Sequence, residues 1–541
     1  MIKYIEKYPL ASIALFTILL LVVNLGIPEV TIMEARNFIT AREMIQDNNW
    51  LLTTMNGEAR YQKPPLPTWL TAISGLAFGV NSLFALRLPA AIMVLILGIT
   101  SYFLSKELKI SNKHSLYNGL VLITSFYVFA IMNEAPWDIF THGFMAIGLL
   151  FLLKFFNDEK INWKNVLLVG IFIGFSIMSK GPVSLFALFL PFVIAYGVVF
   201  KFKKLKEKTV PIIAFIILFL IIGGWWFTYV RLVDPATFLA VANKETGNWS
   251  SYNVRPFYYY WSFFTQSGIW TIPAFVGLLY PYLIKRVTNK KAYRFSFLWT
   301  ILAVILLSII PEKKARYLMP VLIPLALNTS FYINYLINEF TNWKSKKETF
   351  PIYFHFSLVG TLGILAPFGL YFLLKGSISQ YLVSFILTSI SLFTLGFLIW
   401  KNLSKKKITP LFYYTVLFVV SVFLFGLPIS KHFNKNETYN SISSLKKLEE
   451  QHQITTFSID EVTPELIWEY NGKIENIYKE EQLELPKLAS FGLLIMNKDT
   501  SFIQQKLAPN FNLQNLETYN INFGAKQKER LIRQFYLVSK K

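Results

Sequence analysis

Residues 209–230 read TVPIIAFIILFLIIGGWWFTYV, an apolar run without a single charged side chain. A helix of this length crosses the roughly 30 Å hydrocarbon core of a membrane. Similar runs recur through the first 430 residues, and the chain of 541 residues is 54% hydrophobic and 17% aromatic. This composition is typical of a polytopic α-helical membrane protein and excludes an ordinary soluble one.

The apolar runs predict about thirteen membrane spans, each of a length that can cross the hydrocarbon core. They lie near residues 9–27, 84–105, 115–132, 138–154, 164–180, 183–200, 209–230, 262–284, 294–310, 317–338, 351–373, 380–400 and 409–428. A further apolar piece at 66–80 is short and flanked by proline, which favours a re-entrant or interfacial helix. The first run lacks a small-residue cleavage site, so we expect it to be retained as a span.

The distribution of Lys and Arg predicts the orientation, because cytoplasmic loops carry an excess of both. Every second short loop is basic: 106–114, 154–164, 201–208, 285–294, 340–349 and 401–407. The intervening short loops at 132–137 and 374–379 carry only Lys375. We therefore expect a cytoplasmic N-terminus and a C-terminus on the outer, periplasmic side. The net charge of +22 then reflects topology and contact with membrane lipids rather than binding of nucleic acid.

The composition changes near residue 430, which predicts two domains. Residues 1–429 form the transmembrane domain, with two long outer loops at 28–83 and 231–261. Residues 430–541 form a small extracytoplasmic α/β domain with short strands. The expected strands are Thr455–Ile459, Phe491–Met496 and Phe535–Val538, and a helix is expected between Thr463-Pro464 and Asn471-Gly472. The chain has no cysteine, so disulfide and thiol chemistry are excluded.

The first outer loop carries acidic and basic residues just beyond the first span. Glu34 can act as a general base toward an acceptor hydroxyl, or stabilise positive charge that develops on a sugar ring. The alternative is that Glu34 pairs with Arg36 or Arg42 and only shapes the loop.

Lys63 precedes Pro64-Pro65, and proline restricts the residue before it to extended conformations. The ammonium group is thus presented on a stiff backbone at the membrane surface, where it can bind a lipid phosphate and stabilise it as a leaving group. A helix entry with a snorkelling lysine is the structural alternative.

The segment 311–317 places Lys313, Lys314 and Arg316 on the outer side, against the bias of the other loops. A phosphate-binding role explains this exception, and Tyr317 can add a hydrogen bond. Anchoring to lipid headgroups is the alternative.

Three further positions have weaker signals. Asp138 lies at the mouth of the fourth span with His142 one turn later, a spacing compatible with a metal-ligand pair but more typical of a hydrogen-bonded structural pair. Glu245 and Arg255 of the second outer loop are possible substrate contacts.

No nucleotide-binding motif is present: the sequence lacks a phosphate-binding loop, a glycine-rich dinucleotide fingerprint and an Asp-x-Asp pair. A membrane enzyme without these motifs can take its activated group from a lipid-linked donor.

The first loop resembles that of the lipid A aminoarabinose transferases, GT-C-fold enzymes related to the protein O-mannosyltransferases. The matching residues are Glu34-Ala35-Arg36, Ala41-Arg42-Glu43-Met44, Gly57, Arg60-Tyr61, Lys63-Pro64-Pro65 and Trp69. Later matches are Asp138, Lys180-Gly181-Pro182 and Lys314 with Tyr317-Leu318-Met319-Pro320 and Pro324-Leu325-Ala326.

The resemblance implies a GT-C fold, a polyprenyl-phosphate-sugar donor and inverting transfer on the periplasmic face. It implies that Lys63 holds the donor phosphate with help from Tyr317 and its basic neighbours, and that Glu34 lies beside the reacting groups. Arg36, Arg60 and Tyr61 of the first loop are possible substrate contacts. The family usually has Asp-Glu where this chain has Met33-Glu34. Either Glu34 replaces the missing Asp, or Asp138 does, or the acceptor is already anionic and needs no base. Some members carry a glutamate thought to bind metal where this chain has Gln62, so no metal or other cofactor is expected to be required.

The sequence therefore predicts a monomeric glycosyltransferase of the bacterial inner membrane. It would move a sugar from undecaprenyl phosphate to lipid A or another envelope lipid. Transfer to protein Ser or Thr is the alternative within the same class. A lipid-carrier flippase or transporter is the alternative of another class, although such proteins usually show internal symmetry, which is absent from this sequence.

Overall fold

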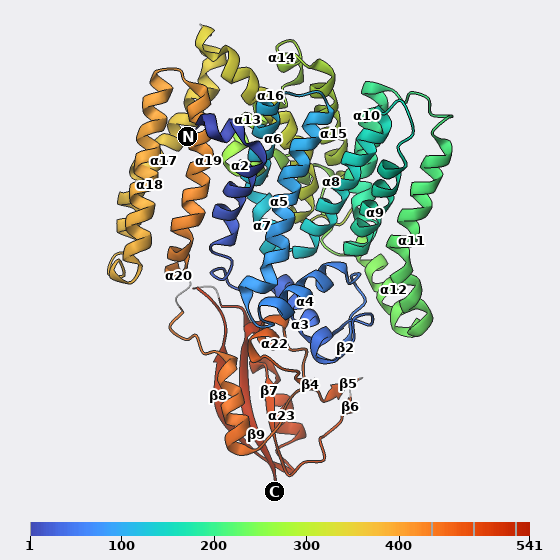
Figure 1. Cartoon of the computed structure of the whole chain (residues 1–541). Helices are drawn as coiled ribbons and strands as arrows, with labels where there is room; N and C mark the ends of the chain where they lie inside the picture. Colours follow the sequence, from blue (N-terminus) through green and yellow to red (C-terminus); the bar gives the residue numbers. More distant parts are fainter. Residues whose placement is uncertain (1, 344, 434–435, 480–481, 525–526) are drawn as a thin grey trace. The chain divides into compact units, whose positions relative to one another are not determined.

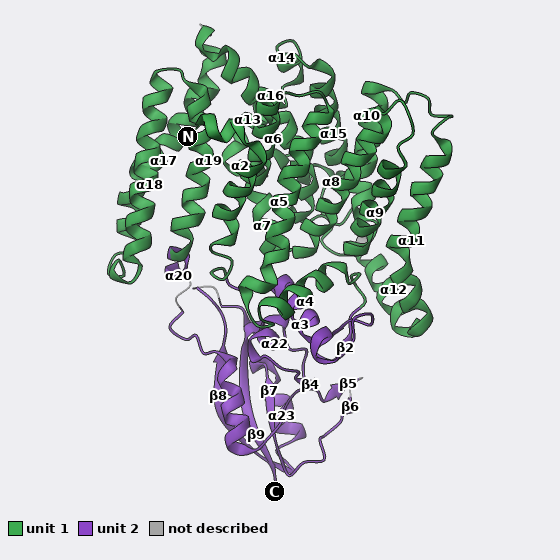
Figure 2. Cartoon of the chain, viewed as in Figure 1, with its two compact units in different colours: residues 1–28, 61–428 green, residues 29–60, 429–541 purple. Residues whose placement is uncertain are grey.

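The structure, a computed structural model, describes residues 2–343, 345–433, 436–479, 482–524 and 527–541. The chain folds into two compact units, which Figure 2 shows in different colours. Unit 1 contains residues 1–28 and 61–428, and unit 2 contains residues 29–60 and 429–541. The chain thus enters unit 2 twice, and each unit is described here by itself.

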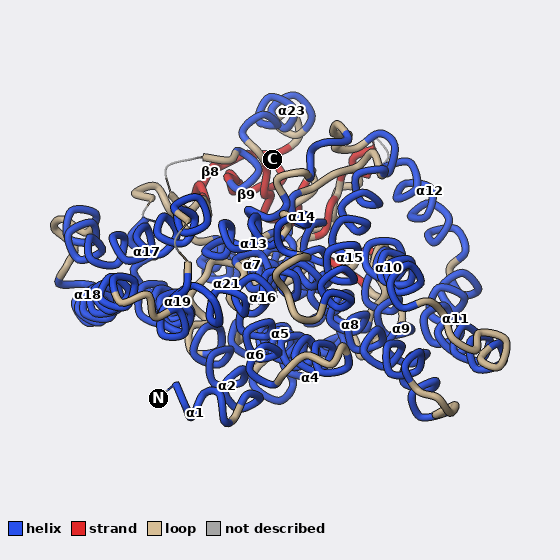
Figure 3. The backbone as a smooth tube through the Cα atoms, turned by 90° about the horizontal axis from the view of Figure 1, so that it is seen from above, coloured by secondary structure: helices blue, strands red, loops and turns tan. Residues whose placement is uncertain are grey.

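Unit 1 is helical, and most of its helices run roughly parallel to one another (Figures 1 and 3). Its elements are α1 (Ile2–Lys7), α2 (Pro9–Thr17), η1 (Ile18–Val22), α4 (Leu66–Phe78), α5 (Leu83–Glu107), α6 (Asn112–Ile123), α7 (Phe126–Glu134), α8 (Pro136–Asn157), α9 (Trp163–Lys180), η2 (Leu185–Phe189), α10 (Leu190–Phe200), α11 (Thr209–Val233), α12 (Pro235–Ser251), η3 (Phe257–Tyr260), η4 (Phe263–Trp270), α13 (Thr271–Gly277), α14 (Tyr280–Leu283), α15 (Lys290–Ile309), η5 (Ala315–Val321), α16 (Leu322–Glu339), η6 (Phe340–Asn342), α17 (Lys346–Leu373), η7 (Ser379–Tyr381), α18 (Leu382–Ser404), α19 (Ile408–Ser421) and η8 (Val422–Gly426).

Within the described residues, 9 helices are long and apolar enough to cross a membrane, or 10 if the bent pair α6 and α7 forms one span. The chain is a multi-pass membrane protein. Most of the expected spans coincide with these helices. Two other expected spans, near 9–27 and 183–200, correspond to shorter apolar helices, Pro9–Val22 and Leu185–Phe200. The short piece expected at 66–80 is α4, whose 13 residues extend only about 20 Å at 1.5 Å per residue.

The apolar run at 262–284, expected as one span, is instead divided among η4, α13 and α14. Gly268 has a φ of +65°, a left-handed conformation that interrupts the helix. A Cβ atom at this position would lie 2.7 Å from the Cβ of Phe126, so the close approach to α7 also requires glycine. Because hydrophobicity alone does not register such a break, the sequence pattern predicted a continuous helix.

Several helices of unit 1 begin with a capping side chain. Ser82 accepts a hydrogen bond from the backbone N–H of Ala85 at the start of α5, and Asn289 accepts one from Ala292 at the start of α15. These side chains satisfy backbone donors that a helix leaves without partners at its N-terminus.

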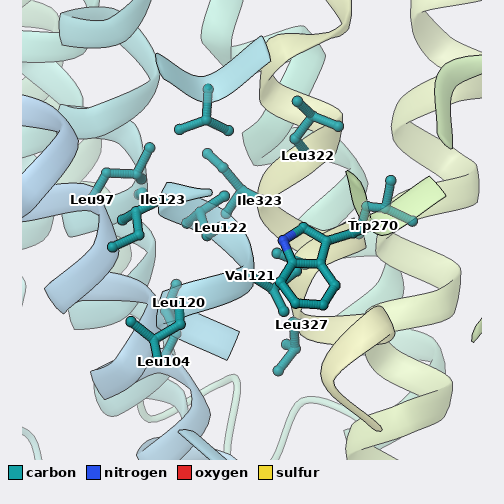
Figure 4. Close-up of a cluster of buried hydrophobic side chains, with 14 of the residues drawn as sticks. Leu97, Leu104, Leu120, Val121, Leu122, Ile123, Trp270, Leu322, Ile323 and Leu327 are labelled. Atoms are coloured by element: carbon teal, nitrogen blue, oxygen red, sulfur yellow. The ribbon is translucent and has the colours of Figure 1, made fainter. Parts of the chain in front are cut away.

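The core of unit 1 is a continuous cluster of aliphatic and aromatic side chains. Figure 4 shows part of it: Leu97, Leu104, Leu120, Val121, Leu122, Ile123, Trp270, Leu322, Ile323 and Leu327. Among the candidate spans, the one that contains α16 is the most deeply buried, whereas those of α11, α17 and α18 are the least. The central helices are therefore held by side-chain packing, and the outer ones present apolar faces suited to lipid.

Unit 2 contains a five-stranded sheet in the order β4-β3-β7-β9-β8. Strand β3 is parallel to β4 and β7, while β9 is antiparallel to β7 and β8. Its elements are α3 (Ile32–Gln46), β1 (Thr54–Met55), β2 (Glu58–Ala59), η9 (Leu427–Ile429, which begins in unit 1), α20 (Ser430–Phe433), η10 (Ile442–Ser444), α21 (Leu445–His452), β3 (Thr456–Ser458), α22 (Pro464–Tyr470), β4 (Glu475–Asn476), β5 (Tyr478–Lys479), β6 (Gln482–Leu483), β7 (Ser490–Ile495), η11 (Asn497–Asp499), α23 (Thr500–Lys506), β8 (Phe511–Asn520), η12 (Glu529–Leu531) and β9 (Ile532–Lys540).

The three strands and the helix expected in this region are all present. Helix α22 begins at Pro464, and Asn471 ends it in a left-handed conformation with a φ of 60°. The Thr463 hydroxyl does not accept the expected capping bond from a backbone N–H of α22; it donates to the carbonyl of Arg530.

The first outer loop divides between the two units, which differs from the expected domain boundaries. Helix α3 packs on α22, where Ala35 and Ile39 join a cluster with Leu466, Ile467 and Tyr470. The C-terminal part of unit 2 begins at residue 429, and residues 29–60, expected to belong to the membrane domain, fold with it. Apolar positions of α3 bury their side chains against α22, which lies more than 400 residues later in the chain.

Candidate active site

Lys63 lies at the start of the short helix α4, whose N-cap is Pro65. Its ammonium nitrogen is 3.5 Å from Oε2 of Glu245, and both side chains are partly exposed. Glu245 belongs to α12, so a residue of the second outer loop serves as a counter-ion for the lysine of the first. A solvent-accessible ion pair of this kind contributes little to stability.

A second contact fastens the same two segments together. The hydroxyl of Tyr61 donates to Oδ2 of Asp234 over 3.1 Å, and Oδ1 of Asp234 accepts the N–H of Thr237 at the start of α12. Burial, followed by the hydrogen bond to Asp234, raises the pKa of Tyr61 to about 12. The pKa of Asp234 is lowered, chiefly by its hydrogen bonding with Thr237. Tyr61 therefore remains a neutral donor at physiological pH.

Asp138 and Lys180 form a buried ion pair between two membrane helices. Asp138 lies in the first turn of α8, which begins at Pro136, and Lys180 is the last residue of α9. The ammonium of Lys180 donates to Oδ1 of Asp138, and the Asp138 residue is only 2% exposed. Its second oxygen, Oδ2, is buried and has no hydrogen-bond partner in the described part of the chain. The carboxylate is paired with Lys180, and this second oxygen is the part that keeps unused hydrogen-bonding capacity.

Two lysines lie over the aromatic ring of Tyr317. The ammonium nitrogens of Lys180 and Lys314 lie 5.1 Å and 5.5 Å from the ring centroid. Its hydroxyl donates to Oε1 of Glu312 over 3.1 Å, and the same oxygen is 2.6 Å from Nζ of Lys314. Lys314 also lies 4.7 Å from the centroid of Tyr252. We call Asp138, Lys180, Glu312, Lys314 and Tyr317 the Tyr317 cluster; it combines cations with aromatic faces, a setting suited to a phosphate and a sugar ring.

Lys313 is bound to backbone carbonyls of the protein. It is 3% exposed, and its ammonium donates to the backbone carbonyls of Arg255, over 3.1 Å, and of Ile310. Burial lowers the pKa of Lys313. The backbone N–H of Lys313 donates to the carbonyl of Asn253, so this residue joins two outer segments. Its role in the structure is to hold the chain, unlike that of its neighbour Lys314.

The remaining basic residues of these segments differ in exposure. The Arg316 guanidinium lies 5.8 Å from the Tyr317 ring centroid, and its Nε is buried without a hydrogen-bond partner among the described residues. Arg255 is exposed. Arg316 therefore adds positive charge at the edge of the Tyr317 cluster.

His142 does not form the hydrogen-bonded pair expected with Asp138. Its Nδ1 is buried without a partner in the described part of the molecule, whereas Asp138 bonds to Lys180. In the same described residues, no group of three or more His, Cys, Asp or Glu side chains is arranged to hold a metal ion.

Glu34, in unit 2, forms a capping box at the start of α3. Its Oε2 accepts the N–H of Thr31 over 3.1 Å, and the Thr31 hydroxyl accepts the N–H of Glu34 over 3.3 Å. Two residues after Glu34, Nη1 of Arg36 lies 3.8 Å from the sulfur of Met33. The resemblance leads us to expect an aspartate at position 33. Because this chain has Met33, Arg36 contacts a neutral thioether there and not a negatively charged carboxylate.

Arg60 and Arg42 bind within unit 2 and hold the loop. The Nη1 of Arg60 donates to the hydroxyl of Thr40 over 3.3 Å, and its carbonyl accepts the hydroxyl of Thr53. Arg42 donates to Asn471 over 2.7 Å. These arginines are therefore engaged with the protein's own oxygen atoms.

Comparison with known proteins identifies the fold. Residues 62–226 match the family described as dolichyl-phosphate-mannose-protein mannosyltransferase. The chain is 26% identical over 308 residues to an uncharacterized protein of Aquifex aeolicus. It is 25% identical over 328 residues to the undecaprenyl phosphate-alpha-4-amino-4-deoxy-L-arabinose arabinosyl transferase of Wigglesworthia glossinidia brevipalpis. The alignments cover 54% and 59% of this chain, and 58% and 56% of those proteins, so the chain spans little more than half of their lengths.

Among solved structures, the chain is similar to ArnT from Cupriavidus metallidurans bound to undecaprenyl phosphate, with a TM-score of 0.68 and 14% identity. The match covers 98% of this chain and 97% of that one. The apo state of the same protein gives a TM-score of 0.65. The chain has the GT-C fold of these structures.

In this GT-C protein, the structure brings together several residues that the sequence singled out separately. Lys63 meets Glu245, and Lys314 and Tyr317 meet Asp138 through Lys180. The family match at 62–226 includes Lys63, Asp138 and Lys180 but not the segment 311–317. These residues form the donor-side candidates in unit 1, while Glu34, Arg36 and Arg60 belong to unit 2.

Sequence reasoning missed Lys180 and Glu312 as members of the site. Lys180 had a signal, because Lys180-Gly181-Pro182 is a point of resemblance, and Gly181 has a φ of +81° that ends α9 directly after the lysine. Glu312 had no such signal in the sequence, because a carboxylate next to three basic residues is most simply explained as their counter-ion.

Proposed function

We propose that the protein is a glycosyltransferase that takes a sugar from a polyprenyl phosphate, such as undecaprenyl phosphate, and transfers it to lipid A or another envelope lipid. The observation that carries this proposal is the Tyr317 cluster, in which two ammonium groups flank one aromatic ring at the ends of membrane helices. A lipid-linked phosphate brings its negative charge to this depth.

The comparisons support the same donor class. The Wigglesworthia relative is named as an arabinosyl transferase that uses an undecaprenyl phosphate sugar, and the Cupriavidus structure is described as bound to undecaprenyl phosphate. The proposal extends that donor to this chain.

In the proposed reaction, an acceptor oxygen forms a bond to the anomeric carbon of the sugar as the bond from that carbon to the phosphate oxygen breaks. Polyprenyl phosphate leaves, and the configuration at the carbon inverts. Lys63, Lys180 and Lys314 stabilise the departing phosphate, because fixed positive charge lowers the energy of the transition state as negative charge develops.

The proton of a hydroxyl acceptor would pass to a carboxylate, and an acceptor that is already anionic has no proton to lose. Glu34 is the candidate base for the first case. Asp138 is better suited to orient Lys180, because one of its oxygens already binds that ammonium. Tyr61, Arg36, Arg60 and Arg255 are candidates for contacts with the sugar or the acceptor.

We further propose that the protein acts as a monomer in the bacterial inner membrane, with its N-terminus in the cytoplasm and unit 2 in the periplasm. The basic loops at 201–208 and 401–407 support this orientation. No metal or other cofactor is required in this scheme, because lysines supply the positive charge that a metal ion would otherwise provide.

Mass spectrometry of envelope lipids from a gene-deletion strain tests the proposal. We expect lipid A or another envelope lipid to lose a mass of one pentose or hexose. The wild-type gene should restore this mass, whereas Lys63→Ala and Glu34→Gln versions should not. Unchanged lipids would contradict transfer to a lipid.

Transfer to protein is the second candidate, and the family match at residues 62–226 favours it. Glycopeptides that disappear from the same deletion strain, with lipids unchanged, would support this candidate instead.

A further inference from the structure

Arg42 makes an unusually complete set of contacts for a residue in an outer loop. It lies in α3, is 2% exposed, and its guanidinium reaches the C-terminal end of α22. Nη1 donates to Oδ1 of Asn471 over 2.7 Å and to the carbonyl of Trp468 over 3.4 Å, while Nη2 donates to the carbonyl of Ile467 over 3.3 Å. The guanidinium also lies 5.4 Å from the centroid of the Trp468 ring.

Two of these acceptors are carbonyls in the last turn of α22, which also accept the N–H of Asn471, and the third is the side chain of the C-cap residue. The helix dipole favours a cation at this end. Burial lowers the pKa of Arg42, and arginine remains charged despite such a shift. Arg42 therefore acts as the C-terminal cap of a helix that lies more than 400 residues later in the chain.

Glu43, next to Arg42 in α3, binds the β1–β2 hairpin. Its carboxylate accepts hydrogen bonds from the hydroxyl of Thr54 over 2.7 Å, from the N–H of Asn56 over 2.7 Å and from the N–H of Gly57 over 3.2 Å. Asn56 in turn exchanges two hydrogen bonds with the backbone of Ile474. The end of α3 is thus fixed to both α22 and the β1–β2 hairpin.

Glu34 and Arg36 lie in the first turns of this same helix. Arg42 lies eight positions after Glu34, which is about 12 Å along a single α-helix at 1.5 Å per residue, and such a helix moves as one body. A change at the Arg42 end therefore tilts or shifts the Glu34 end.

We propose that Arg42 is a positioning residue, through which the C-terminal residues 429–541 orient Glu34 and Arg36 for transfer. This inference rests on the proposed function. It makes the C-terminal part of the chain a component of the catalytic apparatus, with Asn471 and the carbonyl end of α22 as the surface that sets the orientation of α3.

The test uses the full-length protein with Arg42→Met, which keeps an apolar contact with Trp468 but removes the hydrogen bonds. Asn471→Gly removes the same bond from the other side, and glycine tolerates the left-handed conformation of that residue. We expect each variant to lower kcat by about 10- to 100-fold, because a displacement of about 1 Å at a reacting group has effects of that size. The double variant should fall no further than the worse single one, because both changes remove the same contact.

Binding of undecaprenyl phosphate, titrated by intrinsic fluorescence, should remain within about twofold of wild type, because unit 1 is untouched. Hydrogen exchange should show loss of protection in α3 and α22 but not in α5 or α8. A general loss of folding would instead lower donor binding and expose all four helices, and would overturn the inference.

Lys473→Met is the matched control. Lys473 joins the same two segments through Asp47 at 2.8 Å, but both side chains are exposed, so we expect its loss to change little. Equal losses of kcat in Lys473→Met and Arg42→Met would contradict a specific role for Arg42.

Failure of this inference is distinguishable from failure of the proposed function. If wild-type protein transfers no sugar from a polyprenyl phosphate, the proposed function fails. If wild type transfers sugar and Arg42→Met transfers it equally well despite loss of protection in α3, only the positioning role fails.

Discussion

Two charged regions beyond the membrane helices use their residues differently. In segment 311–317 of unit 1, Lys314 and Lys180 share one tyrosine ring, while Asp138 Oδ2 and Arg316 Nε are buried without partners in the described part of the chain. In α3 of unit 2, Arg42 and Glu43 are engaged by backbone groups and side chains of the same unit. The first region has unused hydrogen-bonding capacity for a ligand. The second uses its charges to hold a helix.

Among the variants that test this contrast, Lys180→Met should have the largest effect on stability and on sugar transfer. It leaves Asp138 buried without its cation, which costs about 3–5 kcal/mol of stability. We expect transfer to fall by at least about 100-fold, because the phosphate loses a fixed cation as well. Sugar transfer by purified protein and thermal unfolding in detergent measure the two effects.

The double variant Asp138→Asn/Lys180→Met separates these causes. Since it removes both charges, we expect the melting temperature to recover while transfer stays low. Recovery of transfer would show that Lys180 serves only the fold.

Lys314→Met and Lys313→Met compare the two neighbouring lysines directly. Lys314→Met should raise the KM for the donor by about 10- to 100-fold with little change in melting temperature, because one charged hydrogen bond to a phosphate contributes about 1.5–3 kcal/mol. Lys313→Met should lower the melting temperature without a donor-specific effect, because its ammonium binds backbone carbonyls. The reverse pattern would show that the two lysines have exchanged roles.

Glu245→Gln tests whether Lys63 binds the phosphate of the donor. Glu245 competes with phosphate for Lys63 in the unliganded protein, so its neutralisation should tighten donor binding by about two- to threefold, the value of an exposed ion pair. Lys244→Gln on the same helix is the control, because it changes the charge of α12 without touching Lys63. Weaker donor binding by Glu245→Gln would indicate a direct contact between Glu245 and the donor.

The smallest effect concerns the pH dependence of unit 2. Burial raises the pKa of Asp460 to about 6, although Arg533 lies 3.3 Å away, with Asp499 and Lys498 also nearby. The folded state therefore holds this proton more tightly than the unfolded one, so the free energy of unfolding should fall as pH rises from about 4 to 6, by roughly 1–3 kcal/mol.

Hydrogen exchange in β9, corrected for the intrinsic effect of pH, measures this dependence, and Asp460→Asn should abolish it. A variant that keeps the same pH dependence would assign it to another group.

Much of the fold follows from the sequence because membrane spans are local features. A run such as 209–230 predicts its own helix, and the structure places α11 at Thr209–Val233. The prediction of one span at 262–284 was wrong because Gly268 interrupts the helix where it approaches Phe126, a residue distant in sequence. The division of the first loop between two units depends on contacts between α3 and α22, which no local pattern records.

The candidate site was predictable to the extent that its residues stand out alone. Lys63 has its prolines, and Lys314 and Tyr317 lie in an outer segment of unusual charge. The distinction between Lys313 and Lys314 requires the backbone path, since one side chain turns inward to carbonyls and the other meets Glu312. Lys180 required the pairing of α8 with α9, which the sequence does not show.

The most direct test of the account is sugar transfer by purified protein in lipid vesicles that contain an undecaprenyl-phosphate-linked sugar and lipid A, followed by mass spectrometry of the lipids. The account predicts a lipid product heavier by one sugar residue with wild type, and none above background with Lys63→Ala or Lys180→Met. Equal amounts of product from wild type and both lysine variants would contradict it.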